Sequence, residues 1–185
     1  MGPGPEARTL RHAGCLRVAL KPSIQATFMR AGIALGSNLG DRHALLSQAL
    51  KNLQEIHEGE PASFLASSIL ETEPQDCPPD SPHFLNSVVE LETSRHPVEL
   101  LKLLQALEVA SGRPSDHGHQ SPRSLDLDLL YCDEMTLDTP SIQLPHPSIR
   151  ERLFVLKPLA EIRPELQLPS WDASCSEYLR ILHKK

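Results

Sequence analysis

Alternating apolar and acidic residues at positions 125–129 restrict the fold of this chain more than any other segment. The order Leu-Asp-Leu-Asp-Leu has the two-residue period of a β-strand with one buried face. We therefore expect Leu125, Leu127 and Leu129 to point into the core. Asp126 and Asp128 would then lie side by side on the opposite face, roughly 6–7 Å apart at the usual rise of a strand.

Two neighbouring carboxylates within a strand repel each other, and aspartate is a poor strand residue. A cation bound beside them would offset that repulsion. Mg²⁺ suits such a pair, because it takes one or two carboxylates and completes its shell with water and substrate phosphate. Arg123, just upstream, could bind the same phosphates with its guanidinium group. The alternative is an edge strand with a solvated acidic face, and this segment alone favours neither interpretation.

Composition and charge narrow the class of protein. The chain has 185 residues, of which 39% are hydrophobic and 23% charged, as expected for one domain with a proper core. A formal net charge of −6 argues against nucleic acid or an anionic membrane as a partner, because both require a basic surface. No apolar run reaches transmembrane length, and the N-terminus lacks the apolar core of a signal peptide. The four cysteines follow neither a zinc nor a disulfide pattern, so we expect a soluble protein of the reducing cytoplasm.

The order of the expected elements predicts the fold class. Residues 1–28 show no sustained period, so we expect a flexible leader before a single domain at 29–185. Asp41 is the expected N-cap of the first helix, and Pro97 is the expected first residue of the second. The hydrophobic periods predict strand, helix, strand, strand, helix and strand, at 30–36, 42–56, 62–72, 84–92, 97–111 and 125–129. This is the split βαβ order of a ferredoxin-like α+β domain, an antiparallel sheet with helices packed on it.

Three further groups of residues are candidates for ligand binding. Phe84 and Asn86 project from one face of their strand, and an amide offers the donors and the acceptor that read the edge of a heterocycle. A surface asparagine beside a phenylalanine at the margin of the core is the simpler interpretation. Gln105 and Glu108 lie one turn apart on the second helix and could share a face. The densest cationic cluster of this acidic chain predicts an anionic ligand and comprises His146, Arg150, Arg152 and Lys157.

Four segments together resemble the 6-hydroxymethyl-7,8-dihydropterin pyrophosphokinase family of folate biosynthesis. They are residues 36–39 (Gly-Ser-Asn-Leu), 84–86 (Phe-Leu-Asn), 122–128 (Pro-Arg-Ser-Leu-Asp-Leu-Asp) and 145–156 (Pro-His-Pro-Ser-Ile-Arg-Glu-Arg-Leu-Phe-Val-Leu). The resemblance covers about residues 30–170, nearly all of the chain except the leader. It implies transfer of pyrophosphate from ATP to the hydroxymethyl oxygen of the pterin, with release of AMP.

The resemblance also implies a magnesium site and a catalytic group. Asp126 and Asp128 would bind two Mg²⁺ ions that bridge the phosphates of ATP. Arg113 and Arg123 would complete the catalytic group. ATP and the pterin are the only partners expected, and the family is commonly monomeric.

The same resemblance implies two sets of substrate contacts. The pterin ring would lie between two aromatic side chains, its edge would be read by an amide, and two further positions would contribute backbone groups; these residues are Phe84, Phe154, Asn86, Thr72 and Pro74. The contacts to ATP would be Gln105, Glu108, Arg123, His146 and Arg152.

One loop departs from the family's pattern. Many members have Arg-Trp-Gly-Pro-Arg where this chain has His-Gln-Ser-Pro-Arg at 119–123, so it lacks a tryptophan that helps a loop close over the site. The departure motivates a second hypothesis, a ferredoxin-like pterin- or nucleotide-binding module without turnover. A third is a metal-binding or regulatory domain that uses the paired aspartates with His117 and His119. The two arginines and the two phenylalanines favour the enzyme, because a plain metal-binding domain would need none of them.

Overall fold

The computed structural model describes residues 27–73, 82–112 and 124–182. The expected leader lies outside these residues apart from its last two positions. The elements are β1 (Met29–Ser37), α1 (Arg42–Ile56), the 3₁₀ helix η1 (Pro61–Ser63), β2 (Leu65–Ala66), β3 (Leu70–Thr72), β4 (Phe84–Thr93), α2 (Pro97–Ala110), β5 (Asp126–Cys132), β6 (Leu137–Asp138), β7 (Gln143–Leu144), α3 (Leu153–Ile162) and α4 (Cys175–Leu182).

The main sheet is antiparallel and has the order β2-β4-β1-β5, with β3 also paired to β4. Taken together, β2 and β3 form one edge strand and β5 forms the other. The elements then follow the order strand, helix, strand, strand, helix, strand, and the ferredoxin-like α+β fold predicted from the sequence is confirmed. The short hairpin β6–β7 forms a separate sheet of two strands.

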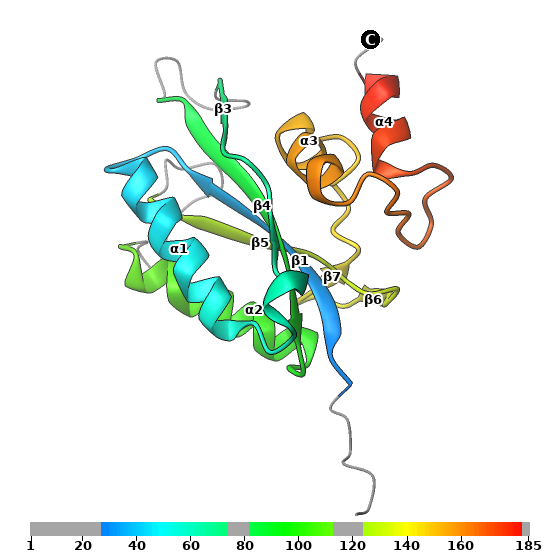
Figure 1. Ribbon diagram of the computed structural model, residues 1–185, viewed down its shortest axis with the longest axis horizontal. Coiled ribbons are helices and arrows are strands. Elements are labelled where there is room, and N and C mark those ends of the chain that lie inside the picture. The colour runs from blue at the N-terminus through cyan, green and yellow to red at the C-terminus, as the bar shows by residue number, and fades with distance from the viewer. Residues whose placement is uncertain (1–26, 74–81, 113–123, 183–185) are drawn as a thin grey trace, which may run out of the picture.

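Helices α1 and α2 cover one face of the sheet (Figure 1). Their apolar sides and the inward residues of β1, β4 and β5 form one buried cluster. The three leucines of the alternating segment belong to it, with exposed fractions of 0%, 3% and 4% for Leu125, Leu127 and Leu129. The predicted buried face of this strand is therefore confirmed, and the two aspartates lie on the other face.

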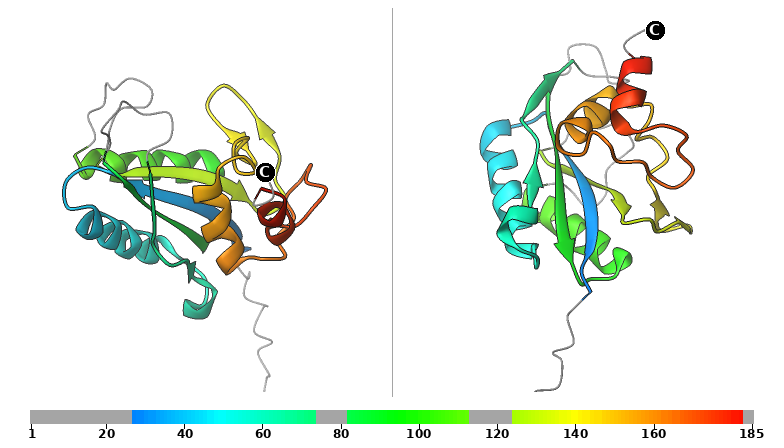
Figure 2. Two further views of the ribbon diagram at one scale, coloured as in Figure 1. Left: turned by 90° about the horizontal axis from the view of Figure 1, so that it is seen from above. Right: turned by 45° about the vertical axis from the view of Figure 1, so that its right-hand side comes forward.

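The opposite face of the sheet is covered at one end by α3 and α4 (Figure 2). A second buried cluster joins Val88 of β4 and Leu130 of β5 to Leu156 and Leu159 of α3 and to Trp171. This cover leaves the first half of β5, which carries the aspartates, at the edge of the apolar packing.

The helix ends follow the local signals in the sequence. The Asp41 carboxylate accepts a hydrogen bond from the backbone N–H of Ala44 (3.0 Å), as an N-cap does. Pro97 is the first residue of α2, and Gly112 follows the helix with a φ of 91°, a conformation that favours glycine. The two helix starts predicted from the sequence, at Asp41 and Pro97, are confirmed.

The sequence predicts one continuous strand at 62–72, and the structure differs from this prediction. The segment consists of η1, then β2 and β3, with a break at 67–69. The break forms because the Ser67 hydroxyl accepts the hydrogen bond of the Val88 N–H (2.9 Å), in place of a backbone carbonyl.

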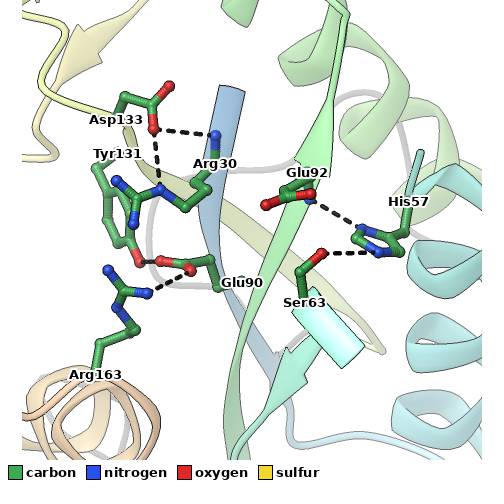
Figure 3. Close-up of polar contacts among 8 residues, drawn as sticks. All are labelled: Arg30, His57, Ser63, Glu90, Glu92, Tyr131, Asp133 and Arg163. Atoms are coloured by element: carbon green, nitrogen blue, oxygen red, sulfur yellow. Dashed lines mark hydrogen bonds and ion pairs between the residues drawn. The ribbon is translucent and has the colours of Figure 1, made fainter. Parts of the chain in front are cut away.

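A buried polar network ties β4, β5 and the end of α3 together (Figure 3). Tyr131 donates a hydrogen bond to one Glu90 carboxylate oxygen (2.5 Å), and Arg163 forms an ion pair with the other (3.2 Å). The Tyr131 ring passes over Gly32 of β1, where a Cβ atom would lie 2.1 Å from ring atom Cε1. Only a glycine leaves room for the ring in this arrangement.

None of the helices within the described ranges combines the length and the apolarity that crossing a membrane requires.

Candidate functional site

The two aspartates of β5 lie beside two small residues of β1. Asp126 pairs with Gly36, and Asp128 pairs with Ala34. A Cβ atom on Gly36 would lie 3.5 Å from Asn86 Oδ1 and 3.9 Å from the Asp126 Cβ. Because Gly36 carries no side chain, the amide of β4 and the carboxylate of β5 are separated by a gap that a methyl group would fill in van der Waals contact.

Asn86 is opposite Gly36 on the other side of β1. Its Nδ2 donates a hydrogen bond to the Thr72 hydroxyl (2.9 Å), and Thr72 is opposite Phe84 in the β3–β4 pair. The bond fixes the orientation of the amide and leaves its Oδ1 and its second N–H for a ligand. Three of the expected pterin contacts, Thr72, Phe84 and Asn86, are thus brought together.

Arg152, the residue before α3, reaches the other aspartate. Its Nη1 lies 3.7 Å from Asp128 Oδ2, and its guanidinium carbon lies 5.8 Å from the centre of the Phe154 ring. Both partners of the ion pair are about 40% exposed, so the contact contributes little to stability and remains open to a ligand. The structure therefore places the expected residues Asp128, Arg152 and Phe154 in one row.

His146 completes this side of the site. Burial lowers the pKa of the imidazole below its usual value; the Asp128 carboxylate opposes the shift, whereas the Arg152 guanidinium adds to it. His146 Nδ1 accepts a hydrogen bond from the Ser148 N–H (3.2 Å), so the neutral ring carries its hydrogen on Nε2. The ring can therefore donate to an anionic oxygen without carrying charge.

The two residues of α2 that are expected to contact ATP differ in their exposure to solvent. Gln105 is exposed, whereas Glu108 is 5% exposed and its Oε1 accepts a hydrogen bond from the Leu127 N–H (2.8 Å). Glu108 thus binds the open edge of β5 between the two aspartates. Their contact with ATP stays a prediction, and so do the other ligand contacts named above.

Several expected site residues cannot be placed. Pro74, Arg113 and Arg123 lie outside the described residues, as do His117 and His119 of the departing loop.

Sequence reasoning overlooked two contributors to the site. Gly36 is the end of the expected strand at 30–36 and the start of the 36–39 segment, but no place between Asn86 and Asp126 is predicted for it, although a glycine in a strand can signal a close approach to the backbone. Arg42 was not considered: its Nη1 donates to Glu71 Oε1 (3.0 Å) and to the His83 carbonyl (2.7 Å), which joins the ends of β3 and β4. Nothing local in the sequence indicates that second contact.

A histidine and a serine elsewhere resemble a catalytic pair but have another role. His57 Nδ1 accepts a hydrogen bond from the Glu92 N–H (3.0 Å), so in the neutral ring Nε2 carries the hydrogen and donates it to the Glu60 carbonyl (2.8 Å). The ring then has no lone pair for the Ser63 hydroxyl, although the two lie 3.4 Å apart (Figure 3). These contacts hold the end of α1 against β4.

The paired aspartates fit magnesium. In the described ranges, His, Cys, Asp and Glu side chains form no cluster of three or more that could hold a metal ion. Mg²⁺ does not need such a cluster, because it keeps water and substrate phosphate in its shell. Asp126 and Asp128 are partly exposed oxygen ligands opposite the small residues Gly36 and Ala34, which suits an ion bound together with a substrate.

Comparison with known proteins decides the family. Residues 32–164 match the sequence model of the 7,8-dihydro-6-hydroxymethylpterin-pyrophosphokinase (HPPK) family. The chain belongs to this family. A 2-amino-4-hydroxy-6-hydroxymethyldihydropteridine pyrophosphokinase of Pseudomonas aeruginosa is 39% identical over 140 residues, covering 76% of this chain and 84% of the relative. The enzyme of the same name from Bacillus subtilis is 41% identical over 147 residues, covering 80% and 86%.

Solved structures agree on the fold. An HPPK-DHPS protein in complex with substrates superposes with a TM-score of 0.67 at 12% identity, over 85% of this chain and 44% of that one. A Plasmodium falciparum HPPK-DHPS variant gives a TM-score of 0.67 at 13% identity, over 86% and 46%. This HPPK chain spans less than half the length of either, and the likeness concerns the fold alone. As a member of its family, it is a transferase of folate biosynthesis that moves a pyrophosphoryl group.

Proposed function

We propose that this HPPK transfers the terminal pyrophosphoryl group of ATP to the hydroxymethyl oxygen of 6-hydroxymethyl-7,8-dihydropterin, releasing AMP, with two Mg²⁺ ions at Asp126 and Asp128. The observation that carries the proposal is the position of the two carboxylates. They stand on a rigid strand with the Asn86 amide on one side and Arg152 on the other.

From the positions of these residues we infer which end of the site would bind each substrate. Asp126 is level with Gly36 and Asn86, so it is the carboxylate nearer the pterin and its hydroxyl group. Arg152 contacts the other carboxylate, Asp128. The charges of Asp128 and Arg152 both act on the pKa of the His146 imidazole. The phosphates of ATP would therefore lie over Asp128, and the acceptor oxygen would lie over Asp126.

The pterin end is built for a flat heterocycle. The Asn86 amide is held by Thr72, so its remaining acceptor and donor meet the ring edge without further ordering. Phe84 and Phe154 would supply the two aromatic faces for the ring. The acceptor hydroxyl would thereby be held in one orientation, and such positioning, together with electrostatic stabilisation, accounts for most of the enzymatic acceleration of phosphoryl transfer.

The nucleotide end offers positive charge and a neutral donor. Arg152 would exchange part of its contact with Asp128 for a phosphate oxygen, and His146 would donate from Nε2. Bound Mg²⁺ would supply charge to stabilise the phosphate oxygens and the leaving AMP. The aspartates would hold that charge in place through the fixed backbone of β5.

Mass spectrometry of the pterin product tests the proposal. Incubation with ATP, Mg²⁺ and the pterin should give a product heavier by two phosphate groups, together with AMP. A product heavier by one phosphate group, together with ADP, would contradict pyrophosphoryl transfer.

The same proposal includes a monomer in the cytoplasm that does not bind nucleic acid. Its support is the net charge of −6 and the thiols of Cys132 and Cys175, which are buried and free. Light scattering of the purified protein should give the mass of one chain, and a dimer mass would contradict this part.

A further inference from the structure

The edge strand beside β4 changes its register by one residue. Ala66 is opposite Val89 in the β2–β4 pair, so an uninterrupted strand would place Ile69 opposite Asn86. Instead, Leu70 is opposite Asn86. Residues 67–69 therefore contain one residue more than the facing segment of β4, which makes the break a β-bulge.

The bulge decides which side chain meets the pterin site. A shift of one residue moves every later side chain of a strand to the other face. Without the extra residue, Glu71 would be opposite Phe84, and Thr72 would point to the opposite face. With it, Thr72 is opposite Phe84 and accepts the hydrogen bond of Asn86 Nδ2 (2.9 Å).

Two serines hold the bulge from two sides. Ser67 binds β4: its N–H donates to the Val88 carbonyl (2.9 Å) and its hydroxyl accepts from the Val88 N–H (2.9 Å). Ser68 faces α3 instead. Its N–H donates to Glu161 Oε1 (2.9 Å), and its hydroxyl donates to Glu161 Oε2 (2.7 Å).

Glu161 therefore links the bulge to the helix that carries Phe154. It lies in the last turn of α3, whereas Phe154 lies in the first. The helix packs on β4. The Glu161 carboxylate therefore fixes the position of β3, which carries Thr72, relative to the part of the site that contains Phe154. A carboxylate that accepts two hydrogen bonds from one residue fixes both its distance and its direction.

We propose that Glu161 is a positioning residue for the pterin: through Ser68 it holds the bulge that places Thr72 beside Asn86. The inference rests on the proposed function, because it assigns Asn86 and Thr72 to the pterin. It adds a residue that touches neither substrate and acts on only one of them.

The test compares Glu161→Ala with Glu161→Gln. Glutamine keeps an acceptor for the Ser68 N–H and can donate to the Ser68 hydroxyl, whereas alanine removes both contacts. Glu55→Ala is the matched control, because Glu55 is an exposed carboxylate on α1, which covers the other face of the sheet. KM for each substrate, kcat and Tm are measured for all variants. Calorimetry with the pterin and a non-hydrolysable ATP analogue gives pterin affinity without turnover.

The expected result is a selective loss. Because Ser68 and Glu161 are both exposed, Glu161→Ala should raise KM for the pterin about three- to fivefold, equivalent to about 0.6–1 kcal/mol, and leave KM for ATP unchanged. Glu161→Gln should restore most of the affinity, and Glu55→Ala should match the wild type. Unchanged pterin affinity in Glu161→Ala, or equal losses for both substrates, would overturn the inference.

Ser68→Ala keeps the inference testable if Glu161→Ala does not fold. It removes the hydroxyl contact alone and should raise KM for the pterin about twofold, whereas wild-type affinity would count against the inference. The failure of the proposed function is a separate result, since it would show as wild-type protein that forms no AMP with the pterin.

Discussion

Gly32→Ala is the substitution whose effect follows most directly from the packing. The new Cβ atom would lie 2.1, 2.6 and 2.7 Å from three atoms of the Tyr131 ring. Carbon atoms in contact are about 3.5–4.0 Å apart, so the ring must move by more than about 1 Å. Because the Tyr131 hydroxyl lies 2.5 Å from a Glu90 oxygen, that movement breaks the hydrogen bond to a carboxylate that is 2% exposed.

The magnitude has three parts. Overpacking of a close-packed interior costs about 1–3 kcal/mol, and loss of a hydrogen bond to a charged group costs about 1.5–3 kcal/mol. The lower chain entropy of alanine in the unfolded state returns about 0.5–1 kcal/mol. We therefore expect the free energy of unfolding to fall by about 3 kcal/mol. For a chain of this size, Tm should fall by roughly 6–12 °C.

Urea unfolding and calorimetry measure this loss, and Gly36→Ala in the same strand is the matched control. There the nearest side-chain atoms would lie at 3.5 and 3.9 Å, so the free energy of unfolding should stay within about 1 kcal/mol of the wild type. In a Tyr131→Leu variant, the further substitution Gly32→Ala should lower the free energy of unfolding by less than about half as much as it does in the wild type. Equal losses of stability in Gly32→Ala and Gly36→Ala would refute the reasoning. An undiminished loss from Gly32→Ala in the Tyr131→Leu variant would also refute it.

Three further predictions concern the site and the thiols. Asp128→Ala should reduce AMP formation by roughly a hundredfold or more, because it removes a ligand of the metal; wild-type activity at ordinary Mg²⁺ would contradict the metal assignment. Asn86→Ala should raise KM for the pterin by roughly tenfold and change KM for ATP by less than about twofold; equal losses in steady-state kinetics would contradict its role. Burial raises the pKa of the Cys132 and Cys175 thiols to about 12, so both should stay protonated and resist iodoacetamide at about pH 8. Peptide mapping should find them modified only after unfolding, and rapid modification of the folded protein would count against their burial.

The parts of the fold that depend on local signals could be predicted from the sequence. The period of the leucines at 125–129 gave the buried face of β5 and the outward direction of both aspartates. Asp41 and Pro97 marked the starts of the two long helices because a cap and a first-turn proline act within one turn. The order of these elements was then sufficient for the fold class.

The parts that depend on distant partners could not be predicted. The bulge at 67–69 needs Val88 and Glu161, which lie about 20 and 90 residues further along the chain. The contact of Arg152 with Asp128 depends on how α3 is placed against the sheet, and the sequence showed only a cationic cluster. Glu108 was expected to share a face with Gln105, but its carboxylate binds the edge of β5, which periodicity on a helix does not reveal.

The most direct test of the account is AMP release by the purified protein from ATP and Mg²⁺, measured with and without 6-hydroxymethyl-7,8-dihydropterin. The account predicts AMP only when the pterin is present, in a one-to-one ratio with the pterin consumed. Absence of AMP while calorimetry shows that the pterin is bound, or AMP release that does not depend on the pterin, would contradict it.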